Sequence, residues 1–216
     1  MFTRLRSLPF TVVLIMMLRK SVKSLPCIVN ESMSGLGFDE ASASAYSQAR
    51  YKMKHSAFIE LNQKAIIDVL YQDEDFKKFW GKRILAIDGS KIRLPNTQGV
   101  CGTFGTIAYS QGQDSDAQGE HPYALRSVLF NVLNRVAIDA TLAPANAYEV
   151  DLAIAQSAHT QHNDLLLMDR NYPSYRMLAT LLKTERDFAI RCSASSFSVA
   201  RRMLKGDGAD SQASLL

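Results

Sequence analysis

The chain has 216 residues, enough for one sizeable domain or for one domain with a small appendage. Apolar residues make up 47% of it and charged residues 21%, a composition typical of a folded globular protein. No apolar run reaches the ~18 residues of a membrane span. Cys27, Cys101 and Cys192 form no CxxC pair that would suggest a zinc site. We therefore expect a cytoplasmic protein with reduced thiols and no membrane partner.

The positive charge is concentrated near the N-terminus. The net charge is +4, from 25 Lys and Arg against 21 Asp and Glu. Residues 1–70 hold nine of the basic and five of the acidic residues, whereas residues 71–216 hold sixteen of each. A basic N-terminal third on a neutral body is typical of a segment that faces nucleic acid, although a solvated helix face explains the charge equally well.

Residues 1–80 are predicted to form a helical, basic region that binds DNA. The apolar segment 8–18 predicts a buried helix. Residues 41–61 predict a longer helix with Tyr46, Ala49 and Met53 on one face and polar or basic residues on the other. This pattern is that of a DNA-reading helix, and many ordinary surface helices share it. The residues predicted to contact DNA are Ser47, Arg50 and Lys54 on this helix and Arg4 and Arg6 near the N-terminus.

Residues 81–205 predict an α/β domain with a mixed sheet and flanking helices. The apolar runs 84–87 and 165–168 are typical of strands buried on both faces. Asn146 and Glu149 have the spacing of a capping box, which predicts a helix from Asn146. The other expected elements are a loop over 96–120, hairpin strands at 124–133 and 136–142, a helix at 174–185 and a strand at 188–192. The tail 206–216 has no pattern that predicts structure.

Two aspartates stand at the ends of the buried strands. Asp88 and Asp169 each follow a four-residue apolar run, and the carboxyl ends of central strands open into the crevice where α/β sheets bind ligands. A turn or helix-capping role is the ordinary alternative. Asp88 argues against it, because its strand continues to Leu94 and a carboxylate among apolar neighbours needs a partner. A divalent metal shared by both carboxylates is one such partner.

Several segments, in order from residue 2 to about residue 205, carry further motifs. They are FTRLRSLPF at 2–10, SASAYSQAR at 42–50, DGSKIRLP at 88–95, residues 122–126 before the hairpin, and LLLMDRNYPS at 165–174. Together they resemble the DDE transposases of the insertion-sequence-four family. Asn171 departs from the resemblance, because that position is usually Gly in this family.

The resemblance implies an RNase H-like catalytic domain that uses Mg²⁺ or Mn²⁺ to cleave and join DNA at transposon ends. Asp88 and Asp169 would be the first two metal ligands. The implied partners are transposon-end DNA and a second copy or a full-length transposase, and the implied location is the nucleoid. We predict that Asp88 and Asp169 end adjacent strands, with carboxylates roughly 4–7 Å apart.

The third ligand of the resembling family lies in a Tyr-x2-Arg-x3-Glu signature, which this sequence lacks. None of its seven glutamates has an Arg four residues before it, and only Glu185 follows Asp169. We therefore expect a truncated transposase with an incomplete catalytic domain over residues 81–205, inactive by itself. The alternative is a non-catalytic DNA-binding remnant that inhibits transposition. An RNase H-like nuclease unrelated to transposition fits the N-terminal segments less well.

Overall fold

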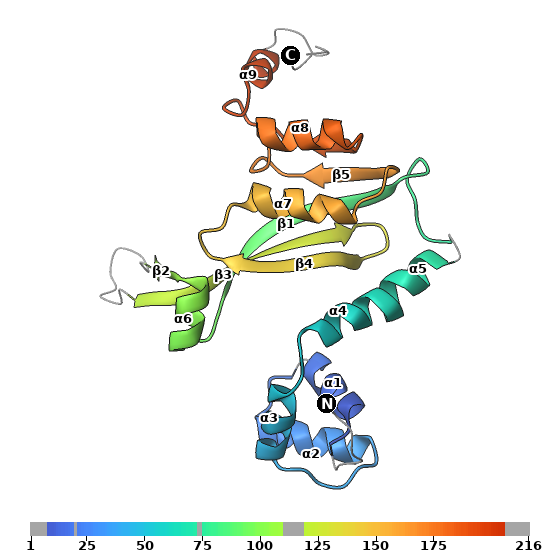
Figure 1. The fold of residues 1–216 in the computed structure, drawn as a ribbon, viewed down its shortest axis with the longest axis vertical. Helices are drawn as coiled ribbons and strands as arrows, with labels where there is room; N and C mark the ends of the chain where they lie inside the picture. Colours follow the sequence, from blue (N-terminus) through green and yellow to red (C-terminus); the bar gives the residue numbers. More distant parts are fainter. Residues whose placement is uncertain (1–7, 20, 73–74, 110–118, 206–216) are drawn as a thin grey trace. The chain divides into compact units, whose positions relative to one another are not determined.

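The computed structural model describes residues 8–19, 21–72, 75–109 and 119–205. The chain divides into two compact units, Met1–Lys64 and Ala65–Leu216 (Figure 1). Within the described ranges no helix has the length and apolar character needed to cross a membrane. The predicted DNA contacts Arg4 and Arg6 and the predicted tail 206–216 lie outside the described residues.

The N-terminal unit is a small helical bundle with its own apolar core. Its helices are α1 (Phe10–Leu18), α2 (Leu25–Gly35), α3 (Ala43–Tyr51) and α4 (Ser56–Asn62). The buried core side chains come from the first three helices and from Leu8, which precedes α1: Leu8, Val12, Val13, Met16, Val29, Met33 and Tyr46. Ala49 and Met53 pack against them. The predicted buried helix at 8–18 and the predicted core face of Tyr46, Ala49 and Met53 are therefore confirmed.

The single helix predicted over 41–61 is wrong, because the chain turns between α3 and α4. Ser42 begins α3 by accepting a hydrogen bond from the N–H of Ala45 at 3.1 Å. At the other end, the N–H groups of Lys52 and Met53 donate to carbonyls three residues back. Such bonds tighten the last turn of a helix, and here they leave Met53 in the core after α3 has ended.

The second unit is built on a mixed β-sheet. Its strands are β1 (Arg83–Arg93), β2 (Thr106–Tyr109), β3 (Gly119–Asn131), β4 (Val136–Pro144), β5 (Asp164–Met168) and β6 (Asp187–Ile190). β3 pairs antiparallel with β1, β2 and β4, whereas β1, β5 and β6 run parallel in that order. This confirms the predicted α/β fold with an RNase H-like mixed sheet.

Helices α7 (Glu149–Gln156) and α8 (Tyr175–Lys183) pack against the central strands β1 and β5. The shared core consists of residues from β1, β3 and β5, one stripe of each helix, and Tyr172 from the connection between β5 and α8: Leu85, Ile87, Leu129, Val150, Ala153, Leu166, Met168, Tyr172, Met177 and Leu181. The remaining helical segments are η1 (Gln63–Ile67), α5 (Asp68–Gln72), α6 (Gln98–Phe104), η2 (Ser157–His159) and α9 (Ser198–Leu204).

Two predicted elements of this unit need correction. The loop expected over 96–120 contains α6 and β2. The helix expected from Asn146 begins at Glu149, with Tyr148 as N-cap and no side-chain capping bond, so the capping box is wrong. The reason is local: Asn146 belongs to a turn closed by a 2.9 Å bond from the N–H of Ala147 to the carbonyl of Pro144. The Glu149 side chain is therefore not used for capping.

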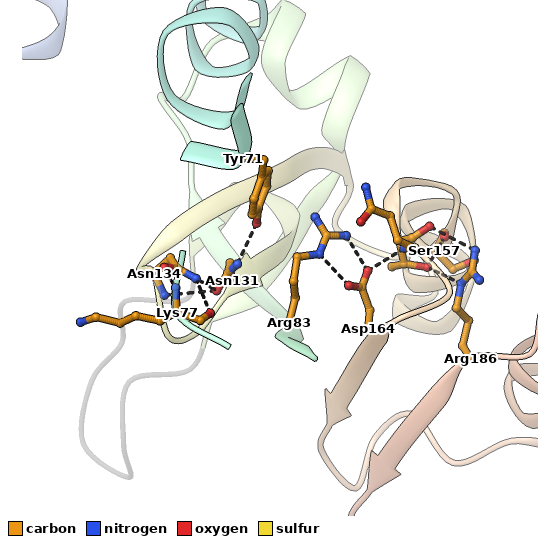
Figure 2. A network of polar contacts seen from close by, with 10 residues as sticks. Tyr71, Lys77, Arg83, Asn131, Asn134, Ser157, Asp164 and Arg186 are labelled. Carbon is orange, nitrogen blue, oxygen red and sulfur yellow. Dashed lines mark hydrogen bonds and ion pairs between the residues drawn. The ribbon is translucent and has the colours of Figure 1, made fainter. Parts of the chain in front are cut away.

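A buried ion pair joins β1 and β5 where both strands begin. The guanidinium of Arg83 donates to both carboxylate oxygens of Asp164 at 2.6 Å, and the two residues are 6% and 0% exposed. Burial alone would lower the pKa of Arg83, but the hydrogen bond and charge of Asp164, assisted by Tyr71, raise it. Figure 2 shows this pair among neighbouring polar contacts of Tyr71, Asn131 and Arg186.

The ion pair predicts a large and asymmetric effect of mutation. Asp164→Asn leaves the Arg83 charge buried without a counter-charge, and we expect the free energy of unfolding in urea to fall by about 3–5 kcal/mol. The double variant Arg83→Met with Asp164→Leu should be more stable than Asp164→Asn, because it buries no charge. A loss below about 1 kcal/mol for Asp164→Asn would contradict this account.

Candidate functional site

Asp88 and Asp169 lie side by side at one edge of the sheet. β1 and β5 are parallel neighbours with Arg83 paired to Asp164 and Ile87 to Met168. Asp88 and Asp169 directly follow the last pair, where the parallel pairing of the two strands stops. The prediction that the aspartates belong to adjacent strands is therefore confirmed, but Asp88 does not end its strand, because β1 continues to Arg93 along β3. The separation of their carboxylates remains a prediction.

Asp88 is exposed, which contradicts the expectation that its carboxylate is desolvated. Ile87 before it is buried in the core under α7 and α8. Because side chains alternate along a strand, Asp88 points away from that core. Its carboxylate makes no hydrogen bond or ion pair with the residues that the structure describes. Its position therefore does not require a metal for stability, and it is accessible to a ligand from solvent.

Asp169 is also exposed, and its carboxylate organises the turn after β5. Oδ1 accepts a hydrogen bond from the N–H of Asn171 at 2.8 Å, the geometry of an Asx turn. The N–H of Tyr172 donates to the Asp169 carbonyl at 3.3 Å. The alternative interpretation is thus confirmed in part, because one carboxylate oxygen of Asp169 does have a turn-forming role. The other oxygen has no hydrogen bond within the described residues.

A third carboxylate, that of Glu149, lies at the same edge. β4 runs in the same direction as β1, because both are antiparallel to β3, so the end of β4 delivers α7 to this edge. The Glu149 side chain lies against the backbone of Gly89. A Cβ atom at Gly89 would be 3.0 Å from Cδ and 3.1 Å from Cγ of Glu149. This close approach leaves little room for a side chain at residue 89 unless Glu149 moves.

The three carboxylates interact electrostatically. The pKa of Glu149 is raised by partial burial and then by the negative charges of Asp169 and Asp88, while Lys91 opposes the rise. Ionised Glu149 therefore carries an energetic cost that a cation at this edge would reduce. Among the described residues, no three Asp, Glu, His or Cys side chains are already arranged to hold a metal ion.

Tyr172 places a buried hydroxyl beside these carboxylates. The residue is 0% exposed, and its hydroxyl is the buried side-chain polar atom of the described residues that has no hydrogen-bond partner. Burial raises its pKa above the usual range, as do the charges of Glu149, Asp88 and Asp169. The N–H of Gly89 is close enough to oppose the rise, but it does not reach ordinary hydrogen-bond geometry.

An open pocket of about 330 Å³ adjoins Glu149. Its wall combines a positive charge, two amides and the Glu149 carboxylate with apolar surface: Lys91, Leu125, Ala145, Asn146, Ala147, Tyr148, Glu149 and Asn171. The pocket therefore carries one positive group, Lys91, and one carboxylate, Glu149.

Sequence reasoning missed Glu149 because it assigned that side chain to helix capping. The glutamate named instead, Glu185, follows α8 and precedes β6. It therefore lies near the amino ends of the parallel strands, at the edge opposite to Asp88 and Asp169. The signal that could have found Glu149 is topological. This residue begins the helix that follows β4, and β4 runs parallel to β1, the strand that carries Asp88.

The predicted DNA contacts of the N-terminal unit are in different places. Arg50 is exposed on α3, and Lys54 is exposed on the connection after it, so they do not share one helix. The hydroxyl of Ser47 donates to the carbonyl of Ala43 at 2.9 Å, within α3.

Residues 79–209, more than half of the chain, match the family described as the transposase DDE domain. The matched range contains Asp88, Glu149, Asp169 and the strands that carry them. The chain belongs to this family. A comparison with curated proteins finds no match.

Solved structures similar to this chain include three of Mos1 assemblies. A pre-cleavage Mos1 transpososome is 12% identical, covering 93% of this chain and 65% of that chain, with a TM-score of 0.32. The Mos1 transposase paired-end complex with left transposon end is 10% identical, with 97% of this chain and 74% of that chain covered and a TM-score of 0.31. The Mos1 strand transfer complex is 12% identical to this chain, with 94% of this chain and 66% of that chain covered and a TM-score of 0.33. The assignment of this chain to the transposase DDE family rests on the family match over residues 79–209 alone.

The contact between Gly89 and Glu149 predicts a coupled effect on stability. Gly89→Ala should lower the free energy of unfolding by about 1 kcal/mol, because the new methyl group displaces the Glu149 side chain. In a Glu149→Ala background the same change should cost less, by about 0.5–1 kcal/mol in a double-mutant cycle. Gly99→Ala is the control, since no atom lies within 4 Å of its added Cβ. Additivity at Gly89 and Glu149 would contradict the contact.

Proposed function

We propose that this chain carries part of the catalytic machinery of a cut-and-paste DNA transposase of the insertion-sequence-four type. The observation that carries the proposal is the pair Asp88 and Asp169, both exposed where the parallel pairing of β1 and β5 stops, inside the matched family range. The chain covers 65% of the length of the first Mos1 chain it resembles. Cleavage and strand transfer are therefore proposed for the whole protein to which these residues belong.

The chemistry of the donor set fits a hard divalent cation such as Mg²⁺ or Mn²⁺. Asp88 and Asp169 offer carboxylate oxygens, the ligands that these ions prefer. Two such ions, when bound, activate the attacking oxygen and stabilise the leaving oxygen in phosphoryl transfer on DNA. Asp88 and Asp169 would hold the ions, and the turn bond from Asn171 would keep Asp169 oriented.

Basic side chains near the aspartates offer contacts for a DNA backbone. Arg126 on β3 is exposed and donates to the hydroxyl of Ser90 at 2.9 Å. Ser90 is two residues after Asp88 and therefore on the same face of β1. Lys91 lines the pocket beside Glu149. We assign Arg126 and Lys91 to phosphate binding, which positions DNA without reading its sequence.

A second candidate function is DNA binding without catalysis, by which the chain would inhibit transposition. It is favoured by the absence of the Tyr-x2-Arg-x3-Glu signature from these 216 residues. The same aspartates and basic residues would then bind a cation and transposon ends without cutting them. Either function places the protein with the nucleoid.

Cation binding and cleavage distinguish these candidates. We expect the 216-residue polypeptide to bind Mn²⁺, and Asp88→Asn and Asp169→Asn each to weaken binding at least about tenfold, measured by electron paramagnetic resonance. Asp187→Asn, at the opposite edge, is the control. We expect no cleavage of transposon-end DNA, because a misplaced ion costs on the order of 10²-fold or more in rate.

The outcomes separate clearly. Cleavage that is lost in Asp88→Asn would rule out the non-catalytic candidate. Mn²⁺ binding that is unaffected by both aspartate variants would overturn the metal site and with it the proposed transposase chemistry of these residues.

A DNA-binding role of the N-terminal unit predicts a salt effect. Arg50→Ala and Lys54→Ala should each weaken binding of transposon-end DNA and reduce the slope of log affinity against log salt by about one, as expected for a lost phosphate contact. Fluorescence anisotropy at several salt concentrations measures both quantities. Lys183→Ala in the other unit is the control. An unchanged slope in both variants would show that Arg50 and Lys54 make no phosphate contact.

A further inference from the structure

We propose that the turn at residues 79–82 is a further DNA contact of this protein, at which the Trp80 ring stacks on an unpaired base. The turn directly precedes β1 and lies at the amino ends of the parallel strands, the edge opposite to Asp88 and Asp169. The inference shares with the proposed function the assumption that DNA is the partner. It uses neither the two aspartates nor a cation.

The backbone of this turn is unfavourable for a tryptophan. Phe79 and Lys82 exchange two backbone hydrogen bonds, of 2.9 and 3.0 Å, which close a two-residue loop. Both loop residues have a positive φ, 50° at Trp80 and 75° at Gly81. Loops of this kind favour Asn-Gly, because the Cβ atom of most other residues is strained in the left-handed region. Tryptophan at residue 80 therefore works against the local folding preference.

The Trp80 side chain is also exposed to solvent, so burial does not compensate for the strain. Trp80 is 88% exposed, and Phe79 beside it is 48% exposed. The two rings are stacked, with centroids 4.6 Å apart and an interplanar angle of 26°. Because Phe79 covers one face of the indole, this exposure leaves the other face open to a planar group. Every nucleic-acid base offers such a planar face.

The turn is anchored to the loop between β3 and β4. The side chain of Asn134 accepts a hydrogen bond from the N–H of Lys77 at 2.9 Å and donates one to the Lys77 carbonyl at 3.0 Å. Asn131 accepts from the Asn134 amide at 3.0 Å and donates to the Tyr71 hydroxyl at 2.7 Å (Figure 2). A rigid support of this kind lowers the ordering cost of binding.

Basic side chains lie on both segments of this support. Lys77 and Lys78 precede the stacked rings, and Arg135 follows Asn134 in the loop between β3 and β4. All three are exposed, and none has an ion pair among the described residues. Cations combined with aromatic rings on which bases stack are the pattern by which proteins bind single-stranded nucleic acid.

The acidic groups of this region leave those cations free among the described contacts. Asp187 pairs with Lys82, and Asp75 is exposed and has no ion pair there. Asp73 and Glu74 lie outside the described residues. A protein partner fits this surface less well than DNA, because the centre of a protein interface is depleted of charged residues.

Fluorescence tests the proposal directly, because Trp80 is the one tryptophan of the chain. The 216-residue protein is titrated with a mixed-sequence single-stranded oligonucleotide, with EDTA present to remove divalent cations. Stacking on an unpaired base should quench the emission, whereas a blunt duplex of the same sequence should not, because its bases are inside the stack. A shift to shorter wavelength on raising the protein concentration alone would show that a second copy covers the ring, and would overturn the proposal.

Trp80→Asn separates binding from folding. Because Asn-Gly suits this turn, the variant should be at least as stable in urea as the native chain. It should nevertheless bind the single strand at least about fivefold more weakly, measured by the anisotropy of a labelled oligonucleotide. Trp80→Phe should lie between the two. Tyr175→Ala is the matched control and should bind like the native chain, since the exposed Tyr175 ring already packs against Phe197.

The outcomes distinguish this inference from the proposed function. If Trp80→Asn binds the single strand like the native chain, the inference is wrong, and the proposed function stands on Mn²⁺ binding by Asp88 and Asp169. If Trp80→Asn is less stable than the native chain, the ring has a structural role and the inference is also wrong. Quenching in the native chain, with weaker binding by an equally stable Trp80→Asn, supports the inference whatever the result for Asp88→Asn.

Discussion

The register between β1 and β5 is the constraint on which the candidate site depends, and a buried ion pair sets it. Arg83 and Asp164 bind each other through two hydrogen bonds at the first paired position of these strands. From there the parallel pairing continues to Ile87 and Met168. A slip of one residue would turn every side chain of one strand to the other face and would bury or misplace one aspartate. Since removing one partner of such a pair is costly, the ion pair excludes alternative registers.

The other end of the paired segment is exposed to solvent. There the core under α7 and α8 ends, and Asp88 and Asp169 are in solvent. Glu149 and Tyr172 are at the boundary, and both have their pKa raised by burial and by neighbouring negative charge. The Tyr172 hydroxyl is buried without a hydrogen-bond partner among the described residues, although its ring belongs to the core. Such uncompensated groups concentrate at functional sites. The ion pair and the core therefore support an edge that is arranged for a ligand.

The two units fold around separate apolar cores and carry different charged groups. The N-terminal unit has an independent apolar core around Val13, Val29 and Met33, so its exposed basic residues are supported without the sheet. The second unit holds the acidic edge and contains the range that matches the transposase DDE domain. The proposed function assigns phosphate contacts to the basic residues of the first unit and cation binding to the aspartates of the second.

The sequence by itself determined the class of the fold and two of the three carboxylates. Buried parallel strands require continuous apolar runs, so the strands before Asp88 and Asp169 could be predicted without a structure. The core-facing side of the segment 46–53 could also be predicted, because Tyr46, Ala49 and Met53 repeat with the helical period.

Only the tertiary structure decided the role of Glu149. Locally its spacing from Asn146 indicates a helix cap, but the turn after β4 uses Asn146 and leaves the glutamate facing Gly89. The break after Tyr51 and the exposure of Asp88 were hidden for a related reason. Both depend on which surfaces the neighbouring elements cover, and that is set by packing between segments far apart in the chain. Periodicity reports only which side of one element is apolar.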